Sequence, residues 1–214
     1  MLMIFIKILV FNPFQVNCYI LYDDTKECII IDPGCHTQEE YIILENFINQ
    51  NNLKPVAFYN THCHVDHIAG NYFVSKHLKI PLGIHKAGEI FLENAISHAQ
   101  VYGFNIHEVI KPSIYLEDND FIKFGNSELK ILYTPGHADG SVCFYSEKEK
   151  FVIVGDVLFE SGIGRTDFPT GDYDLLIDKI KNKLLVLDDS TVVYPGHGNS
   201  TTIGEEKKYN PFLK

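Results

Sequence analysis

The order of β-rich and helical segments is the feature that most limits the fold of this chain. Near the start, three apolar runs rich in β-branched and aromatic residues end at turn residues, and they lie at residues 3–11, 17–22 and 27–32. Apolar residues then recur at helical spacing from Thr37, a suitable N-cap with Glu40 three residues later. Three more β-rich runs lie at residues 129–134, 141–146 and 150–155, before Asp172 or Asp174, either of which can cap a helix. Two stretches of strands, each followed by a helix, predict an α/β fold with two sheets in a sandwich and helices outside.

The remaining segments fit between these elements. We expect strands at residues 55–59, 81–84 and 190–194, and helices at residues 68–78, 86–100 and from 172 or 174 to about 186. No linker or low-complexity stretch divides the 214 residues. Because a domain commonly has roughly 100–200 residues, one domain over residues 1–214 is expected.

The charge balance bears on the partners of the protein. The chain has 28 Asp and Glu residues against 18 Lys and Arg residues, which gives a formal net charge of −10. Its longest basic cluster is only Lys207-Lys208, so a phosphate backbone would be repelled over most of the surface. We therefore expect a small-molecule substrate and no nucleic-acid partner, and we make no prediction of the oligomeric state.

The cysteines and the apolar runs bear on the compartment. No apolar run approaches the roughly 20 residues needed to span a bilayer, and Lys7 interrupts the apolar start, which has no basic n-region. The five cysteines are scattered without a CxxC pair, which is typical of reduced thiols. We expect a cytoplasmic protein without membrane contact, in which Cys18, Cys28 and Cys143 are core residues.

Half of the ten histidines lie at strand ends beside turn residues, and these five are His62, His64, His67, His137 and His197. A neutral imidazole is a common ligand for zinc, iron or manganese. In an extended loop His62 and His64 point to the same side, so both rings can reach one ion while Asp66 and His67 bend towards a neighbouring one. The pattern predicts a metal site with room for two ions.

Asp156 completes this group, because it ends the β-rich run at 150–155 and a carboxylate can bridge two cations. Its alternative role is to cap a turn. The other five histidines lack such neighbours and are expected to be surface or half-buried side chains; they are His36, His77, His85, His98 and His107. Cys63 should point away from His62 and His64 and pack in the interior.

The motifs resemble those of the metallo-β-lactamase superfamily. The resemblance is carried by Thr61-His-Cys-His-Val-Asp-His67, His137, Gly155-Asp156 and Gly196-His197. Ile31-Asp-Pro-Gly34 and Gly162-Ile-Gly-Arg-Thr-Asp-Phe168 resemble the glyoxalase II and persulfide dioxygenase branch, and Tyr194-Pro-Gly-His-Gly198 with the Thr201-Thr-Ile-Gly-Glu205 tail is similar to short, single-domain glyoxalase II-like hydrolases. This family implies a four-layer αβ/βα sandwich of two mixed β-sheets, with the site at one edge.

The resemblance also implies roles for single residues. His62, His64 and His137 would hold a first metal, Asp66, His67 and His197 a second, and Asp156 would bridge them, with zinc the expected ion and iron or manganese the alternatives. A hydroxide between the metals would attack a thioester carbonyl, with Asp66 and Asp156 as the catalytic carboxylates. Arg165 lies where the family places a basic residue near the thiol, although it can instead pair with Asp167 or Asp172. We also expect Asp32, Thr61 and Thr134 either to orient the imidazoles or to act as packing caps.

Other functions stay open. Full-length glyoxalase II has a C-terminal helical domain that binds glutathione, whereas only 17 of the 214 residues follow His197 here, which weakens the case for a glutathione thioester. A mononuclear iron persulfide dioxygenase is the alternative enzyme, because that branch shares Thr61-His-Cys-His64 and the Arg165 region. A metal-binding module without catalysis is the alternative outside enzymes.

Overall fold

The computed structural model describes residues 3–214, and the first two residues of the expected 1–214 domain lie outside this range. One mixed sheet of six strands comes from the first half of the chain. Its order is β1 (Phe5–Phe11), β2 (Val16–Tyr22), β3 (Glu27–Ile31), β4 (Lys54–Tyr59), β5 (Leu82–Ile84) and β6 (Ile114–Tyr115). The first three strands are antiparallel, and β3 to β6 are parallel.

The second half of the chain forms another mixed six-stranded sheet. Its order is β14 (Thr201–Thr202), β13 (Val192–Pro195), β10 (Phe151–Gly155), β9 (Val142–Ser146), β8 (Ser127–Tyr133) and β7 (Phe121–Phe124). Only the β10–β13 pair is parallel. A separate hairpin pairs β11 (Leu158–Phe159) with β12 (Gly162–Ile163).

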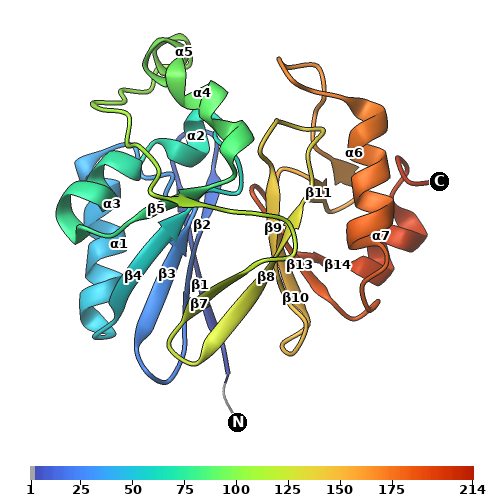
Figure 1. Cartoon of the computed structure of the whole chain (residues 1–214), viewed down its shortest axis with the longest axis horizontal. Helices are drawn as coiled ribbons and strands as arrows, with labels where there is room; N and C mark the ends of the chain where they lie inside the picture. The colour runs from blue at the N-terminus through green and yellow to red at the C-terminus, as the bar shows by residue number, and fades with distance from the viewer. Residues whose placement is uncertain (1–2) are drawn as a thin grey trace.

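Helices cover the outer faces of both sheets (Figure 1). Those from the first half are α1 (Gln38–Gln50), α2 (Val65–Ile68), α3 (Asn71–Leu78), a 3-10 turn (Lys86–Gly88), α4 (Glu89–Glu93) and α5 (Ala95–Val101). Those from the second half are α6 (Tyr173–Lys179), a π-helical turn (Ile180–Leu184) and α7 (Ile203–Tyr209). Among residues 3–214, no helix is both long enough and apolar enough to cross a bilayer.

The core is divided into three apolar clusters, which correspond to the spaces between four layers. One cluster joins the first sheet to α1, α3 and α4, through residues such as Tyr41, Phe58 and Val74. A second lies between the sheets and contains Tyr19, Ile29 and Phe144, and a third joins the second sheet to α6 and α7. The αβ/βα sandwich predicted from the sequence is therefore confirmed.

Local chemistry explains most of the element boundaries. Thr37 caps α1, because its Oγ1 accepts a hydrogen bond from the Glu40 amide, as predicted. The Glu40 carboxylate instead accepts hydrogen bonds from the Asn12 and His36 amides, so it ties α1 to the β1–β2 turn. Asp172 rather than Asp174 caps α6, through a hydrogen bond from the Leu175 amide.

Three predicted segments differ from the structure. The helix expected at 86–100 is broken into the 3-10 turn, α4 and α5, with interruptions at Gly88 and Asn94. The helix expected up to residue 186 widens into the π-helical turn after Lys179. The loop expected around Asp66 and His67 is the short helix α2, which begins at His64.

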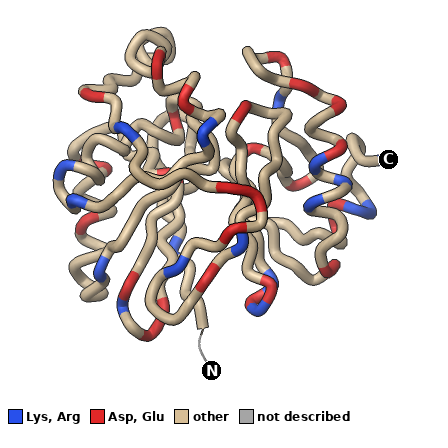
Figure 2. Tube along the Cα trace, viewed as in Figure 1, with Lys and Arg blue, Asp and Glu red and all other residues tan. Residues whose placement is uncertain are grey.

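The strand ends place the functional loops together. The parallel strands β3 and β4 of the first sheet and β10 and β13 of the second end at the edge between the sheets, and so does β8. The loops that follow these strands start at Asp32, Asn60, Asp156, Gly196 and Thr134. Figure 2 shows that Lys and Arg are interspersed with Asp and Glu along the trace around this edge.

Candidate metal centre

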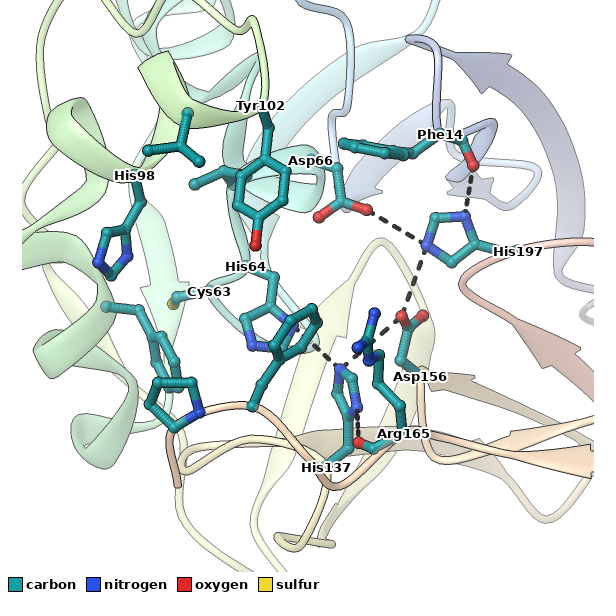
Figure 3. Close-up of a pocket in the computed structure, with 15 residues that line it drawn as sticks. Phe14, Cys63, His64, Asp66, His98, Tyr102, His137, Asp156, Arg165 and His197 are labelled. Atoms are coloured by element: carbon teal, nitrogen blue, oxygen red, sulfur yellow. Dashed lines mark hydrogen bonds and ion pairs between the residues drawn. The ribbon is translucent and has the colours of Figure 1, made fainter. Parts of the chain in front are cut away.

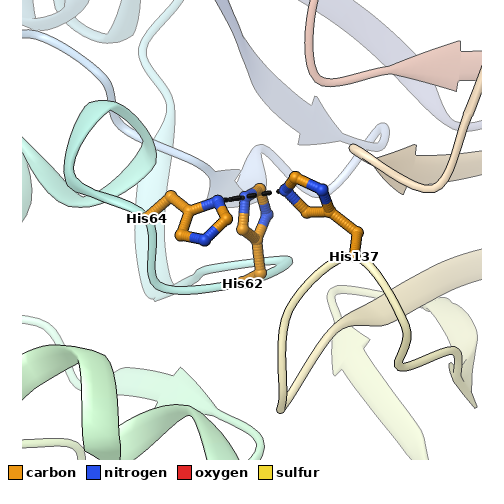
Figure 4. Close-up of side chains that lie close together, drawn as sticks. All are labelled: His62, His64 and His137. Carbon is orange, nitrogen blue, oxygen red and sulfur yellow. Dashed lines mark hydrogen bonds between the residues drawn. The ribbon is translucent and has the colours of Figure 1, made fainter. Parts of the chain in front are cut away.

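Three imidazoles meet in a first cluster, as Figure 4 shows. His64 Nδ1 lies 3.1 Å from His62 Nε2 and 3.0 Å from His137 Nε2. The outer nitrogens of two of the rings are occupied, because His62 Nδ1 contacts Thr61 Oγ1 and His137 Nδ1 donates to the carbonyl oxygen of Arg165. The inward nitrogens, which are His62 Nε2, His64 Nδ1 and His137 Nε2, therefore face one common point.

Burial keeps these three rings neutral. Desolvation and the neighbouring imidazoles lower the pKa of His62 well below its usual value and the pKa of His64 to about 3. Desolvation also lowers the pKa of His137. Neutral imidazoles whose inward nitrogens lie about 3 Å apart have facing lone pairs, which a cation would stabilise. The geometry and the donor chemistry fit a metal ion.

A second cluster contains Asp66, His67 and His197. The Nε2 atoms of His67 and His197 lie 3.3 Å apart, and His197 Nε2 is 3.3 Å from Asp66 Oδ2. His197 Nδ1 donates to the carbonyl oxygen of Phe14, which leaves Nε2 facing inward. Burial lowers the pKa of His197, but hydrogen bonds to the Asp156 and Asp66 carboxylates raise it to about 9. These carboxylates show that the cluster attracts positive charge.

Asp156 lies between the two clusters. Its Oδ1 is 3.4 Å from His67 Nε2, and its Oδ2 is 3.8 Å from His137 Nε2 and 3.5 Å from His197 Nε2. Oδ1 is buried without a hydrogen-bond partner, a costly state for a carboxylate oxygen. Burial raises the pKa of Asp156, but the facing histidines hold it well below its usual value. A cation at this position would satisfy the orphaned oxygen.

The structure thus brings together all seven side chains that the sequence singled out as ligands. Three sets of donor atoms lie within 4.8 Å of one another: His62, His64 and His137; His62, His67 and Asp156; and Asp66, His67 and His197. These imidazoles and carboxylates make up the donor set of a divalent-metal site.

Of the three supporting residues expected from the sequence, two contact the cluster. Asp32 accepts hydrogen bonds from the Thr61 amide at 2.7 Å, from Thr61 Oγ1 at 2.6 Å and from His67 Nδ1 at 2.9 Å. Thr134 instead contacts Cys143 Sγ at 3.2 Å, so it serves packing. Asp32 and Thr61 therefore orient the imidazoles.

Other supporting residues were missed. Asn12 Nδ2 donates to the carbonyl oxygen of Asp66, and Asn60 Nδ2 donates to that of His67. Asn17 Nδ2 donates to the carbonyl oxygens of Pro195 and Gly198, on both sides of His197. Asn17 and Asn60 are polar residues within or next to apolar runs, and that contrast was the signal that could have revealed them.

The metal centre opens into a cavity of about 520 Å³. Figure 3 shows Asp66, His137, Asp156, Arg165 and His197 around this space, with His98 and Tyr102 on its other side. Arg165, which the resemblance places near the thiol of a substrate, lines the cavity, and its guanidinium pairs with Asp167 at 2.7 Å, the alternative role named from the sequence. His98 was expected to be a surface or half-buried side chain; it is exposed, and α5 places it on the wall of the cavity.

The cysteines follow the packing prediction. All five are free thiols and buried, including Cys63, whose side chain is 2% exposed. Cys63 Sγ packs against Gly88, where an added β-carbon would lie 3.1 Å from the sulfur. Burial raises the pKa of the Cys63 thiol, and Cys63 belongs to none of the three groups of candidate ligands.

The family follows from a family model that matches most of the chain. The family model described as "Metallo-beta-lactamase superfamily" matches residues 11–197, a range that contains all seven residues of the metal centre. The chain belongs to the metallo-β-lactamase superfamily. The two mixed sheets and the helices outside them agree with this membership.

A curated relative extends the similarity over the whole chain. "Hydroxyacylglutathione hydrolase GloC" of Haemophilus influenzae is 37% identical over 210 residues, which cover 97% of each chain. This similarity supports the assignment of the chain to a family of metal-dependent hydrolases.

Solved structures of this superfamily show the same fold. The BLEG-1 B3 metallo-β-lactamase has a TM-score of 0.89 at 37% identity, over 98% of this chain and all of that one. TTHA1623 in a di-iron-bound form has a TM-score of 0.86 at 32% identity, over 97% of this chain and all of that one. ETHE1 from Myxococcus xanthus has a TM-score of 0.79 at 25% identity, over 97% of this chain and 83% of that one.

Proposed function

We propose that the protein is a zinc-dependent hydrolase that cleaves the thioester of a small molecule, as a glyoxalase II-like enzyme acting on an S-2-hydroxyacylglutathione or a related thiol ester. The observation that carries this proposal is the position of Asp156 between the two clusters, with one buried oxygen that has no hydrogen-bond partner. The name of the curated relative GloC supports the thioester as the bond that is cleaved.

The protein side chains would hold two divalent ions in fixed positions. His62, His64 and His137 would hold the first ion and Asp66, His67 and His197 the second, and Asp156 would supply carboxylate oxygens beside both groups. When bound, such ions lower the pKa of water to roughly 7 and polarise a carbonyl oxygen. The inward-facing Nε2 atoms of His67 and His197 are set by Asp32 and by the Phe14 carbonyl.

Carboxylates and the cavity then define the direction of attack. Asp66 lines the cavity, and its Oδ2 lies 3.3 Å from His197 Nε2. Asp66 can therefore orient the nucleophilic water as well as hold a metal. A thioester carbonyl would enter beside His64 and His137, which both line the same cavity. Arg165 lines this cavity as well and is the candidate for contacting the thiol part of the substrate.

A mononuclear iron persulfide dioxygenase is the second candidate. The specific observation in its favour is the Thr61-His-Cys-His64 and Gly164–Phe168 resemblance, together with the similar fold of ETHE1. The Tyr194-Pro-Gly-His-Gly198 segment and the Thr201-Thr-Ile-Gly-Glu205 tail favour the hydrolase, whereas the donors of the second cluster are common to both branches. Since both branches keep those residues, metal content and activity must decide between them.

The test compares substrates on one preparation. Protein purified without added metal is analysed for metal content, reconstituted with zinc, and assayed against S-lactoylglutathione, other thioesters, a lactone and a β-lactam. Hydrolysis of thioesters that depends on zinc supports the proposal. Preferred cleavage of the β-lactam, or no cleavage of any substrate, would overturn it.

A further inference from the structure

The wall of the cavity beyond the metal centre is built of apolar side chains from four separate segments. Phe14 comes from the β1–β2 turn, Phe91 from α4, Val101 and Tyr102 from the end of α5, and Phe168 with Pro169 from the segment after β12. Phe14 and Phe168 lie 154 positions apart in the sequence and come together only in the fold. Their convergence on one cavity marks a subsite for an apolar group.

The apolar wall begins directly at the metal centre. The ring of Phe91 packs edge-on against His64 with centroids 5.1 Å apart, and Phe168 packs against the same ring at 5.8 Å. His64 is one of the proposed metal ligands, so a carbonyl bound there would direct its acyl group between Phe91 and Phe168.

The wall continues outward to the rim. Phe14 stacks on Phe104 with ring centroids 5.3 Å apart and meets Tyr102 edge-on at 6.0 Å. Val101 is 78% exposed and Tyr102 is 47% exposed, although both line the cavity. Large exposed apolar side chains at a cavity mouth are costly in water and are typical of a binding surface.

Positive charge is scarce in this cavity. Arg165 is the one Lys or Arg among the described residues that line it. Its Nε and Nη2 bind both oxygens of Asp167 at 2.7 Å, and its guanidinium stacks 3.7 Å above the ring of Phe168. The glutathione part of a thioester carries carboxylates that need cationic or amide partners, and the one Lys or Arg side chain that lines the cavity is already paired with Asp167.

We propose that the preferred substrate is a thioester with an apolar acyl group on an uncharged thiol, and that Phe91, Val101 and Phe168 form the acyl subsite. This inference rests on the proposed thioester hydrolase activity and narrows it. The formal charge of −10 further disfavours thiols with several negative charges. Water adds to the carbonyl carbon, the C–S bond breaks, and a free carboxylic acid and a thiol are released.

Activity tests the substrate preference. Acetyl, butanoyl and hexanoyl thioesters of N-acetylcysteamine are compared with the same acyl groups on glutathione and with S-lactoylglutathione, using zinc-loaded protein. We expect kcat/KM to rise about threefold for each added methylene and to be about tenfold higher on the uncharged thiol. Fastest cleavage of S-lactoylglutathione, or no dependence on acyl length, would overturn the inference.

A matched pair of variants locates the subsite. Val101→Asp puts a charge on the cavity wall at an exposed position of α5, whereas Ile96→Asp puts it on the same helix at a residue 46% exposed that does not line the cavity. Val101→Asp should lower kcat/KM for the hexanoyl thioester about tenfold more than it lowers kcat/KM for the acetyl thioester, while Ile96→Asp changes neither. Equal effects of the two variants would contradict the placement.

Binding separates this inference from the proposed reaction. S-methyl and S-hexyl thioethers of N-acetylcysteamine and of glutathione cannot be hydrolysed, and their dissociation constants are measured by calorimetry on the zinc-loaded protein. Tighter binding of the hexyl thioethers without thioester cleavage would sustain the apolar subsite and refute the hydrolase. Thioester cleavage with equal binding of the methyl and hexyl compounds would sustain the hydrolase and refute the subsite.

Discussion

The carboxylate of Asp32 holds the ring of His67: its Oδ2 lies 2.9 Å from His67 Nδ1, and both side chains are fully buried. The Thr61 amide and hydroxyl also donate to Asp32, so the carboxylate is satisfied without solvent. Burial lowers the pKa of His67, but the Asp32 carboxylate and two neighbouring carboxylates raise it well above its usual value. The pair connects the end of β3 to the metal centre.

Asp32→Asn should weaken metal binding without removing a ligand. An amide cannot accept hydrogen bonds at both of its ends, so His67 loses the partner that fixes its tautomer, and we expect metal affinity to fall about 10–100-fold. Asn is the suitable replacement because Asp32 has a φ of 50°, a conformation that Asn tolerates. Competition with a zinc chelator measures the affinity, and Asp174→Asn on the exposed face of α6 is the control. Unchanged affinity of Asp32→Asn would contradict the role of the pair.

Gly196→Ala should disturb the centre sterically. A β-carbon at Gly196 would lie 2.1 Å from Asp156 Oδ1 and 2.7 Å from the Cε1 of His67, far inside van der Waals contact. Because both side chains belong to the metal centre, we expect metal affinity to fall by about tenfold or more. Gly162→Ala is the control, since its β-carbon would meet the nearest atom at 3.6 Å. Metal content and Tm of the two variants are compared, and equal metal content would contradict the crowding.

The sequence indicated the strands and the histidines at their ends, because both depend on local pattern. The segment from Thr61 to His67 directly follows a short apolar run, and this order places the segment at the end of a strand. The contacts that complete the centre join distant positions, so local pattern can mark a residue such as Asn17 as unusual but cannot name its partner. The Phe14 carbonyl meets His197 across 183 positions, and Asn17 meets Pro195 across 178. Such pairings depend on how the two sheets pack.

The residues that line the cavity could not be predicted from the local sequence pattern either. Tyr102 and His98 reach the cavity because the expected helix at 86–100 breaks at Gly88 and Asn94 and turns α5 towards the metal centre. An unbroken helix over residues 86–100 would place His98 elsewhere. Short breaks in a helix depend on tertiary contacts, such as the close approach of Gly140 to Gly88. Such contacts cannot be read from the local sequence pattern.

Asp23→Ala should destabilise the end of the sandwich that is distant from the metal centre. Asp23 is buried and accepts hydrogen bonds from Thr25 in its own turn and from the Asn126 amide and Ser127 hydroxyl of the β7–β8 turn. Loss of this buried anion should reduce the free energy of unfolding by about 3 kcal/mol, or roughly 6–12 °C in Tm. Thermal unfolding followed by circular dichroism measures the change, with Asp24→Ala as the exposed control.

The effect of Asp23 should depend on pH in a defined direction. Burial raises the pKa of Asp23, but the hydrogen bonds from Thr25, Asn126 and Ser127 lower it below the ordinary value of 3.8. Because the folded-state pKa is the lower one, the stabilisation is present above pH 3.8 and is lost as the pH falls through the folded-state value. The difference in Tm between the protein and Asp23→Ala should therefore shrink below that pH, and a constant difference would contradict the account.

The five thiols should be unreactive in the folded protein. Burial raises the pKa of Cys28, Cys35 and Cys143 to about 12, and it raises the pKa of Cys18 and Cys63 as well. Since the thiolate is the reactive form, a disulfide reagent at pH 8 should label none of the five within minutes and all five in guanidinium. Rapid labelling of any of the five thiols in the folded protein would contradict this prediction.

The central claim is that the two clusters around Asp156 hold two metal ions that serve thioester hydrolysis. Its most direct test is metal analysis of protein purified without added metal, paired with thioester turnover and with oxygen uptake on glutathione persulfide, for the protein and for His62→Ala. We predict close to two divalent ions per chain, thioester cleavage without oxygen uptake, and loss of both metal and cleavage in His62→Ala. One iron per chain with oxygen consumption, or thioester turnover by metal-depleted His62→Ala, would contradict the account.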